Sequence, residues 1–345
     1  MRQPDKNRFL KAARHVESEE ISFQENEVDL GYIRHFLGPS VPPVRSYQLP
    51  VASCLELNRL CGNDLVFLGF GWGLGRKNVV GPDGRLHYVD GTMKTPRDLK
   101  HINCPSLDPI RRRMDEICAA VENTGLGIIY AAQHWPFLVA CAIGYQDYYL
   151  ALADNPGFIR EFQKRVRDYC LHEMELVLGY PVDVVQLAAV FCMKTGAMIS
   201  RDLIEEFEFP ALREMAGRAG AKGCVVSLHI DGDVRAFIPD FIGLGINVLN
   251  PIEPCGGQDI YEIKRLFGDR IALHGNIDVG SVLVNGTPQE VSRSVAEHIG
   301  RLAAGGGYIC ASSHDIGDNV PIENFCAMRD TVLNFRFRRL GRESA

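Results

Sequence analysis

Short apolar runs, each followed at once by a cluster of polar residues, dominate the C-terminal half of the chain. Segments with the apolar spacing of amphipathic helices lie between these runs. Continuous apolar strands that alternate with helices are typical of a parallel sheet covered on both faces. The pattern predicts strands at residues 224–229, 246–250, 270–275 and 307–312, with helices at 234–243, 258–267 and 287–303 between them.

The same alternation extends upstream and completes a barrel pattern. It predicts strands at residues 64–70, 126–132 and 182–188 and helices at 8–18, 108–123, 146–155, 157–179, 200–219 and 321–337. An eighth strand is expected near residues 46–52. Polar residues at the end of strand after strand are how a (β/α)₈ barrel assembles an active site. We therefore predict an α/β fold of the TIM-barrel type, a single domain with an irregular N-terminal extension (1–60) and a barrel (61–345).

The alternative architecture is an open doubly wound sheet with a cap domain. Such a sheet would carry a phosphate-binding Gly-x-Gly-x-x-Gly loop between a strand and a helix. The glycines from Gly69 to Gly75 follow a predicted strand, but the next residues lead to a hairpin turn at Gly81-Pro-Asp-Gly84 rather than to a helix. A dinucleotide site is therefore not expected.

Composition limits the class of protein. The 345 residues are 46% hydrophobic and 23% charged, with a formal net charge of −6, which is ordinary for a globular protein and unlike a general nucleic-acid binder. Neither a signal peptide nor an apolar stretch long enough to span a membrane is evident. The eleven cysteines are scattered and none has Cys-x-x-Cys spacing. We expect a cytoplasmic protein with free thiols and without a nucleic-acid or membrane partner.

Two histidines at strand ends are the main candidates for chemistry. His229 and Asp231 follow one strand, and His314 follows the last strand. An imidazole and a carboxylate two residues apart point the same way in extended chain, so the pair can hold a divalent metal or orient the histidine for acid–base work. In the alternative interpretation, Asp231 caps the next helix and His229 is a core residue. A second histidine at the same mouth favours a site with metal ligands His229, Asp231 and His314.

Further polar residues follow other strands. Glu253 stands between two prolines, and Asn276 and Asp278 follow the strand at 270–275. Glu253, Asp278 and His314 are predicted catalytic groups, and Asn276 is predicted to bind substrate. The alternatives are a surface carboxylate for Glu253 and an Asx-turn that ends the strand for the other pair. Asp278 is favoured as functional because the residues after it are not expected to need a cap.

Three residues of the N-terminal half are also predicted to line the substrate pocket. Gln133 and His134 end a strand, and Trp72 lies in the glycine-rich segment at the mouth.

Two cysteines, Cys255 and Cys310, could add a thiolate ligand to a zinc site, although most cysteines in apolar strands are inert.

An ordered series of motifs resembles the uroporphyrinogen decarboxylase superfamily, and its methyltransferase-like branch more than the decarboxylase proper. The motifs are His229-Ile-Asp-Gly-Asp233, Gly245-Ile-Asn-Val-Leu-Asn-Pro-Ile-Glu-Pro254, Gly275-Asn-Ile-Asp278, Ser313-His314 and Pro321-Ile-Glu-Asn324. The resemblance covers residues 125 to 335 well. It implies a (β/α)₈ barrel, often dimeric, with its site at the carboxyl ends of the strands. It also implies either a decarboxylase without cofactor or a methyltransferase that uses zinc and a corrinoid protein.

Some residues depart from the family pattern, and these differences limit which activity the resemblance implies. In the methyltransferases a His-x-Cys pair and a later Cys hold zinc. His229 matches that histidine, Asp231 replaces the pair's cysteine, and His314 falls at or next to the later cysteine. A His/Asp/His set is harder than His/Cys/Cys and better suited to polarising an oxygen. Against the decarboxylase proper, Ala189-Val190 replaces a paired aspartate and the arginine-rich signature that grips porphyrinogen carboxylates is absent.

The predicted function is therefore a methyltransferase or demethylase component. It would move a methyl group from a small methylated substrate to a corrinoid protein, with the assistance of Zn²⁺, and the resemblance adds a homodimer as an expected assembly. One alternative is a cofactor-free decarboxylase of a small carboxylic acid, with Asp278 and His314 as proton-transfer groups. The other is a non-catalytic binding barrel, for which the replacement at Ala189-Val190 gives some support.

Overall fold

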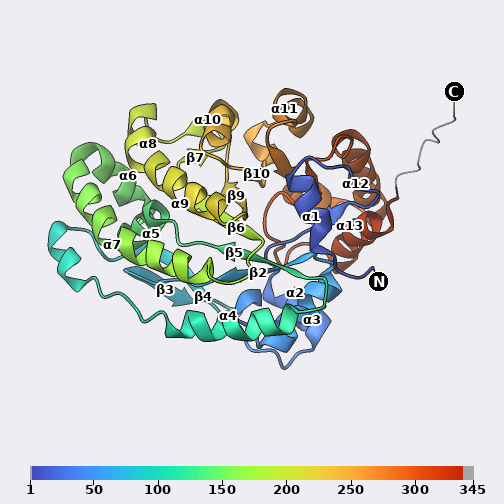
Figure 1. Cartoon of the computed structure of the whole chain (residues 1–345), viewed down its shortest axis with the longest axis horizontal. Coiled ribbons are helices and arrows are strands. Elements are labelled where there is room, and N and C mark those ends of the chain that lie inside the picture. The colour runs from blue at the N-terminus through green and yellow to red at the C-terminus, as the bar shows by residue number, and fades with distance from the viewer. Residues whose placement is uncertain (1, 337–345) are drawn as a thin grey trace.

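The computed structural model describes residues 2–336, apart from the side chain of Cys255, and is built around a sheet of eight parallel strands (Figure 1). The sheet order is β1-β12-β11-β10-β9-β6-β5-β2. The predicted (β/α)₈ barrel is confirmed. The strands are β1 (Ser22–Phe23), β2 (Leu65–Gly69), β5 (Gly127–Ala131), β6 (Val184–Ala189), β9 (Val225–Ile230), β10 (Val248–Asn250), β11 (Ala272–His274) and β12 (Tyr308–Cys310).

Helices surround the sheet, as Figure 1 shows. In α12, Thr287 accepts a hydrogen bond from the backbone N–H of Glu290, whose side chain returns to the Thr287 N–H, and Pro288 takes the first helical position. The helices are α1 (Lys6–Ala13), α2 (Leu30–Leu37), α3 (Val51–Cys61), α4 (Asp108–Val121), α5 (Trp135–Ile143), α6 (Tyr145–Asp154), α7 (Pro156–Val177), α8 (Arg201–Phe207), α9 (Phe209–Ala221), α10 (Ile238–Gly243), α11 (Ile260–Phe267), α12 (Pro288–Leu302) and α13 (Ile322–Asn334). None of the helices within residues 2–336 is long and apolar enough to cross a membrane.

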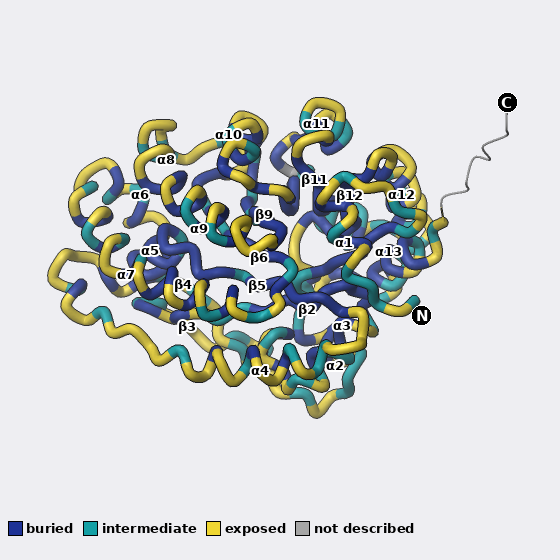
Figure 2. The backbone as a smooth tube through the Cα atoms, in the orientation of Figure 1, coloured by how far each residue is buried: buried dark blue, intermediate teal, exposed yellow. Residues whose placement is uncertain are grey.

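The barrel interior is filled by side chains of the strands and of α1. One inward cluster joins residues of seven strands to Phe9, Ala12 and Ala13 of the helix. The Phe9 ring is fully buried and meets the His274 ring edge-on, with centroids 5.8 Å apart. Figure 2 shows the strands as buried segments inside a more exposed ring of helices. Helix α1 thus plugs the barrel and supports its interior side chains from the amino end.

Side-chain hydrogen bonds connect β1 and β2, the two ends of the sheet order. The Ser22 hydroxyl donates to Asp64 Oδ2 at 3.0 Å, and the Leu65 N–H donates to Gln24 Oε1 at 2.9 Å. Arg8 of α1 donates to Asp64 Oδ1 at 2.8 Å and fixes the plug helix to the same point. Residues 1–60, predicted as an extension, therefore contribute a strand and the plug to the barrel.

The prediction of an eighth strand near residues 46–52 is wrong. Residues Ser46–Gln48 form a 3₁₀ turn, and α3 begins at Val51 directly after Pro50. The remaining strand is β1, whose two residues are too few to show an apolar period. The predicted hairpin turn at 81–84 is confirmed, because it joins the antiparallel strands β3 (Arg76–Val80) and β4 (Leu86–Gly91).

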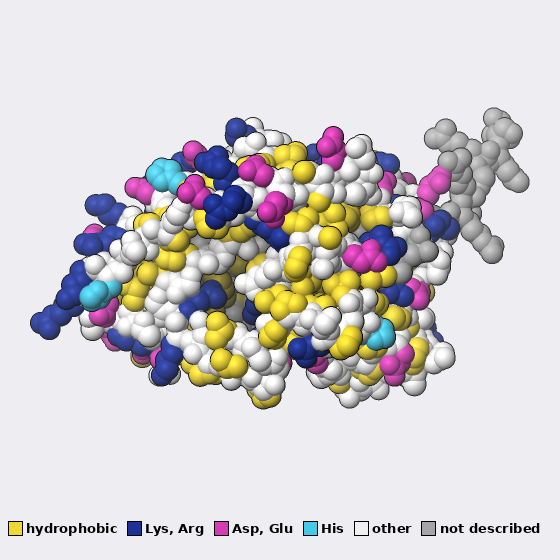
Figure 3. All heavy atoms as spheres, turned by 90° about the horizontal axis from the view of Figure 1, so that it is seen from below, with side chains coloured by type: hydrophobic (Ala, Val, Ile, Leu, Met, Phe, Trp, Pro, Cys, Tyr) yellow, Lys and Arg dark blue, Asp and Glu magenta, His cyan; other side chains and the backbone are white. Residues whose placement is uncertain are grey.

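Charges are distributed without a continuous basic stripe on the face that Figure 3 shows, where lysine and arginine alternate with acidic side chains.

The ten cysteines whose side chains the structure describes are all free thiols, as the scattered cysteines predicted.

The plug predicts a large effect of one substitution. Phe9→Ala should lower the free energy of unfolding by about 3–5 kcal/mol, because it leaves a cavity between strands that cannot collapse. Leu150→Ala, at a side chain that is 54% exposed, should change it by less than about 0.5 kcal/mol. Urea unfolding followed by circular dichroism compares the two, and similar small losses would show that α1 does not support the barrel.

Candidate metal centre at the barrel mouth

The orientation of His229 is set by Asn250 on the neighbouring strand. The two residues are register partners at the carboxyl ends of β9 and β10. The Asn250 Nδ2 donates to the carbonyl of His274 at 3.0 Å, so its Oδ1 faces His229 Nδ1 at 2.7 Å. Because an amide oxygen can only accept, His229 carries its proton on Nδ1. The Nε2 lone pair is therefore free on the side that faces Asp231.

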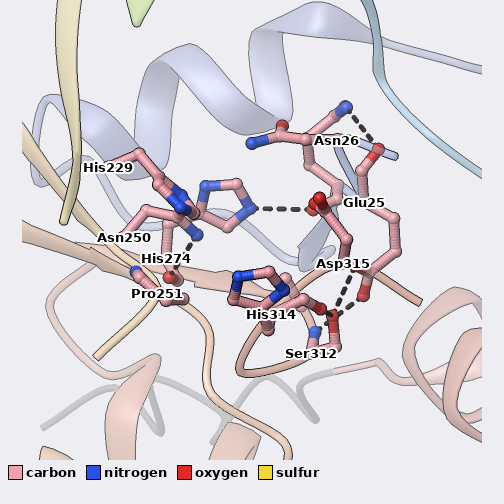
Figure 4. Close-up of a pocket in the computed structure, with 11 residues that line it drawn as sticks. Glu25, Asn26, His229, Asn250, Pro251, His274, Ser312, His314 and Asp315 are labelled. Atoms are coloured by element: carbon pink, nitrogen blue, oxygen red, sulfur yellow. Dashed lines mark hydrogen bonds between the residues drawn. The ribbon is translucent and has the colours of Figure 1, made fainter. Parts of the chain in front are cut away.

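His229, Asp231 and His314 form one cluster, as predicted. His229 Nε2 lies 3.5 Å from Asp231 Oδ1, and His314 Nε2 lies 3.9 Å from Asp231 Oδ2. One potential ligand atom from each residue falls within 4.8 Å of the others. Asp231 Oδ1 is buried and has no hydrogen-bond partner. Figure 4 shows the two imidazoles at the edge of the same pocket.

This geometry fits a metal ion with three protein ligands. Two ligands of a tetrahedral zinc ion with bonds near 2.0 Å lie about 3.3 Å apart, close to the His229–Asp231 separation. Three ligands and an open position are typical of catalytic rather than structural zinc. Of the two cysteines considered, Cys310 is buried in β12 and desolvation raises the pKa of its thiol to about 12. The side chain of Cys255 lies outside the described residues.

The pocket beside the cluster includes a segment that the sequence analysis did not identify. Gln24, Glu25 and Asn26 follow β1 and line the pocket. Figure 4 shows Glu25 and Asn26 across the pocket from His229. No clear signal in the sequence marks these residues, because the two-residue strand before them is too short to show an apolar run. The whole lining is Gln24, Glu25, Asn26, His229, Asn250, Pro251, His274, Ala311, Ser312, His314 and Asp315, around a cavity of about 10 Å³. That volume holds one water-sized group.

Glu25 connects the first strand to the loop that bears His314. Its Oε1 accepts from the Ser312 N–H at 2.7 Å, and its Oε2 lies 2.6 Å from the Ser312 hydroxyl oxygen. The Ser312 hydroxyl also contacts the backbone carbonyl of His314. The Glu25 side chain is almost fully buried, and desolvation raises its pKa from 4.5 to about 8 despite these hydrogen bonds. Glu25 thus holds the His314 loop as a largely protonated carboxyl near neutral pH.

The carboxylates of Glu253 and Asp278 accept hydrogen bonds from backbone N–H groups. Glu253 Oε2 accepts from the Gly232 N–H at 2.7 Å and so supports the loop that carries Asp231. Asp278 Oδ1 accepts from the Gly280 and Ser281 N–H groups, and its Oδ2 accepts from the Ser281 hydroxyl at 2.6 Å. The expectation that the segment after Asp278 needs no cap is therefore wrong, because a helical turn begins there. Their catalytic roles stay predictions.

The structure does not bring the other predicted pocket residues to this cavity. Asn276 is buried and donates to the Ile252 carbonyl at 2.6 Å. Gln133 Oε1 accepts from the Trp72 N–H at 3.1 Å, and the indole of Trp72 packs on Tyr169. His134 is fully buried, and desolvation lowers its pKa to about 3. Their substrate contacts remain predictions, since these side chains pack among neighbours rather than beside His229 and His314.

Together these features define an α/β-barrel with a two-histidine, one-carboxylate cluster at the carboxyl ends of its strands. Residues 73–335 match the family described as Uroporphyrinogen decarboxylase (URO-D), so the chain belongs to the uroporphyrinogen decarboxylase family. The predicted membership of this superfamily is confirmed, and the matches are consistent with its methyltransferase-like branch.

Individual relatives include both chemistries of the family. A methylated-thiol–coenzyme M methyltransferase of Methanosarcina mazei is 25% identical over 64% of this chain and 55% of its own length. A uroporphyrinogen decarboxylase of Coxiella burnetii is 34% identical over 23% of this chain and 22% of its own length. The matched part thus spans about half or less of these relatives. A solved methyltransferase from Methanosarcina mazei shares the fold, with a TM-score of 0.75 and 16% identity over 95% of this chain and 97% of that one.

The raised pKa of Glu25 predicts a pH-dependent stability. The folded carboxyl keeps its proton up to about pH 8, whereas an unfolded one loses it near 4.5, so the unfolded state binds fewer protons between these values. The free energy of unfolding should therefore fall by a few kcal/mol as pH rises through this window. Glu25→Gln cannot ionise and should remove the share of the fall that Glu25 contributes, while Glu173 and Glu208, whose pKa values are also raised by burial, keep theirs.

Urea unfolding with a chelator present, at about pH 5 and about pH 9, tests this expectation. Glu116→Gln, at an exposed position of α4, is the matched control and should follow the wild type. Equal pH dependence in Glu25→Gln and the wild type would contradict the assignment of this proton to Glu25.

Proposed function

We propose that this protein is a methyltransferase or demethylase component that moves a methyl group from a small methylated substrate to a corrinoid protein. The observation that carries the proposal is the cluster of His229, Asp231 and His314, whose potential ligand atoms lie within 4.8 Å of one another. Three protein ligands would leave the fourth position of a tetrahedral ion for the substrate. The similarity to a methylated-thiol–coenzyme M methyltransferase supports methyl transfer as the reaction class.

In this proposal, His229, Asp231 and His314 hold Zn²⁺, which when bound supplies a Lewis acid for the substrate heteroatom. The bond between the methyl carbon and the substrate heteroatom would break, and the heteroatom would keep the electron pair and take a proton from water. The corrinoid protein would supply the electron pair of the new bond to the methyl carbon. Asn250 presents His229 in the tautomer that can coordinate. Glu253 and Glu25 hold the loops of Asp231 and His314. His314 would be free for proton transfer only in the metal-free decarboxylase alternative.

The donor set favours an oxygen substrate over a thiol. A site of two imidazoles and a carboxylate is harder than one that contains thiolates, and harder sites suit oxygen ligands. We therefore propose a methyl ether as the methyl donor. The expected homodimer and cytoplasmic location stay predictions.

Decarboxylation of a small carboxylic acid is the second candidate, because the family and a Coxiella burnetii relative include that activity. The lining of the cavity offers it little support. The lining residues include neither lysine nor arginine, whereas a carboxylate substrate would need a cationic partner. A non-catalytic barrel is a third candidate, and the absence of metal binding would favour it.

Metal content provides the first test. The wild-type protein, reconstituted with Zn²⁺ and desalted, should retain one equivalent, and His229→Ala should lose it because two ligands cannot hold the ion. His101→Ala, at an exposed position, should retain zinc like the wild type. Elemental analysis measures the ratio. With Co²⁺ instead, the near-ultraviolet spectrum should show no thiolate-to-cobalt charge-transfer band. A metal-free wild type would refute the zinc part of the proposal.

The role of Asn250 provides a second test. Asn250→Leu removes the acceptor that fixes the His229 tautomer and should weaken zinc binding by about 10- to 100-fold. Asn247→Leu, at the opposite end of the same segment and away from the cluster, should leave zinc affinity unchanged. Competition with a chromophoric chelator measures both, and equal affinity in the two variants would show that Asn250 does not orient the ligand.

A further inference from the structure

The cavity beside the metal cluster is acidic. The carboxylate of Asp315 lines it and that of Asp231 stands at its edge, whereas the buried Glu25 carboxyl in the lining is largely protonated near neutral pH. Figure 4 shows Glu25 and Asp315 on one side of the cavity and His229 with Asn250 on the other. No lysine or arginine is among the lining residues. The electrostatic field of the lining therefore favours a cation over a neutral molecule, and a neutral molecule over an anion.

His274 places an unused acceptor in this lining. Its side chain is 1% exposed, and its Nε2–H donates to the Gln24 carbonyl at 2.7 Å. Its Nδ1 therefore bears a lone pair, and that atom is buried without a partner. Desolvation lowers the pKa of His274 to about 4, so the ring stays neutral and Nδ1 stays an acceptor near neutral pH.

Asn26 contributes a second unused acceptor. Its Nδ2 donates to Gln186 Oε1 at 2.9 Å, and its Oδ1 is buried without a partner. Two other polar groups of the lining already have protein partners, since Asn250 donates to the His274 carbonyl and the Ser312 hydroxyl contacts Glu25. The orphaned buried atoms of the lining are thus acceptors, and a ligand that satisfies them must donate hydrogen bonds.

We propose that this cavity binds an ammonium group of the substrate, so that the methyl donor is a small methyl ether that carries a protonated amine. The part of this statement that concerns the methyl ether rests on the proposed function, and the ammonium site does not. The cavity of about 10 Å³ admits one water-sized group, which is the size of an ammonium head. Its N–H groups would donate to His274 Nδ1 and Asn26 Oδ1, and its charge would face the carboxylate of Asp315.

Three ligands of similar size test the proposal: 2-methoxyethylammonium, 1-methoxypropane and methoxyacetate. Calorimetric titration of the metal-free full-length protein should show the cation binding at least ~100-fold more tightly than the neutral ether, which would leave both acceptors unpaired. Methoxyacetate should bind most weakly. In ¹⁵N NMR the His274 Nδ1 resonance should move upfield with the cation and not with the ether, because the lone pair accepts a new hydrogen bond.

Variants locate the site. Asn26→Leu removes one acceptor and should weaken binding of 2-methoxyethylammonium at least ~10-fold. Asn78→Leu, at an exposed position of β3, should bind like the wild type. An unchanged His274 resonance in metal-free Asn26→Leu shows that the cavity is intact. Asp315→Asn, which removes the charge that would face the ammonium, provides a second variant with the same expected loss should Asn26→Leu fail to fold.

The outcomes separate this inference from the proposed function. Equal affinity for the cation and the ether, or binding of neither, would mean that the cavity holds only water, and the ammonium site would be wrong even if zinc and methyl transfer were demonstrated. Cation binding that shifts His274, without methyl transfer to a corrinoid protein, would support the site and refute the reaction instead.

Discussion

The amide of Asn250 is the interaction on which the mouth of this barrel depends. One side chain joins three consecutive strands, because it sits on β10, donates to β11 and accepts from His229 on β9. Since an amide has one donor end and one acceptor end, fixing the donor on the His274 carbonyl leaves only the oxygen for His229. The packing of the strands thereby determines the tautomer of His229, the histidine that is proposed to hold a metal. A buried amide of this kind stabilises the fold only when both ends are satisfied, so the same bonds serve the strand register and the site.

The N-terminal segment completes the barrel and the site together. Asp64 receives hydrogen bonds from Arg8 of the plug helix and from Ser22 of β1, and so anchors the two-residue strand at the edge of the sheet. Because β1 pairs with β12, the residues after it arrive opposite the loop that carries His314. Glu25 reaches Ser312 for this reason. The acidic side of the cavity is therefore a consequence of how the barrel closes.

Local patterns in the sequence were sufficient to predict most of the helices and strands. Apolar runs at 182–188 and 224–229 correspond to β6 and β9, and the helices at 287–303 and 157–179 correspond to α12 and α7 within a few residues. The failures have physical causes. β1 is too short to show a period, and Leu49-Pro-Val51 has the apolar character of a strand although Pro50 precedes a helix. Asp278 could not be identified as a cap because a carboxylate after a strand looks the same whether it accepts backbone N–H groups or faces a substrate.

The sequence by itself determined the barrel class, the family, and the placement of His229, Asp231 and His314 at strand ends. These follow from the spacing of apolar residues and from motif order, which are properties of neighbouring residues. Only the tertiary structure decided that the three side chains meet and that Gln133, His134 and Trp72 pack elsewhere. Only the tertiary structure also showed that Glu25, Asn26 and His274 form one acceptor-rich cavity. The reason is that hydrogen bonds between residues far apart in the chain depend on strand register and barrel closure, which no local period encodes.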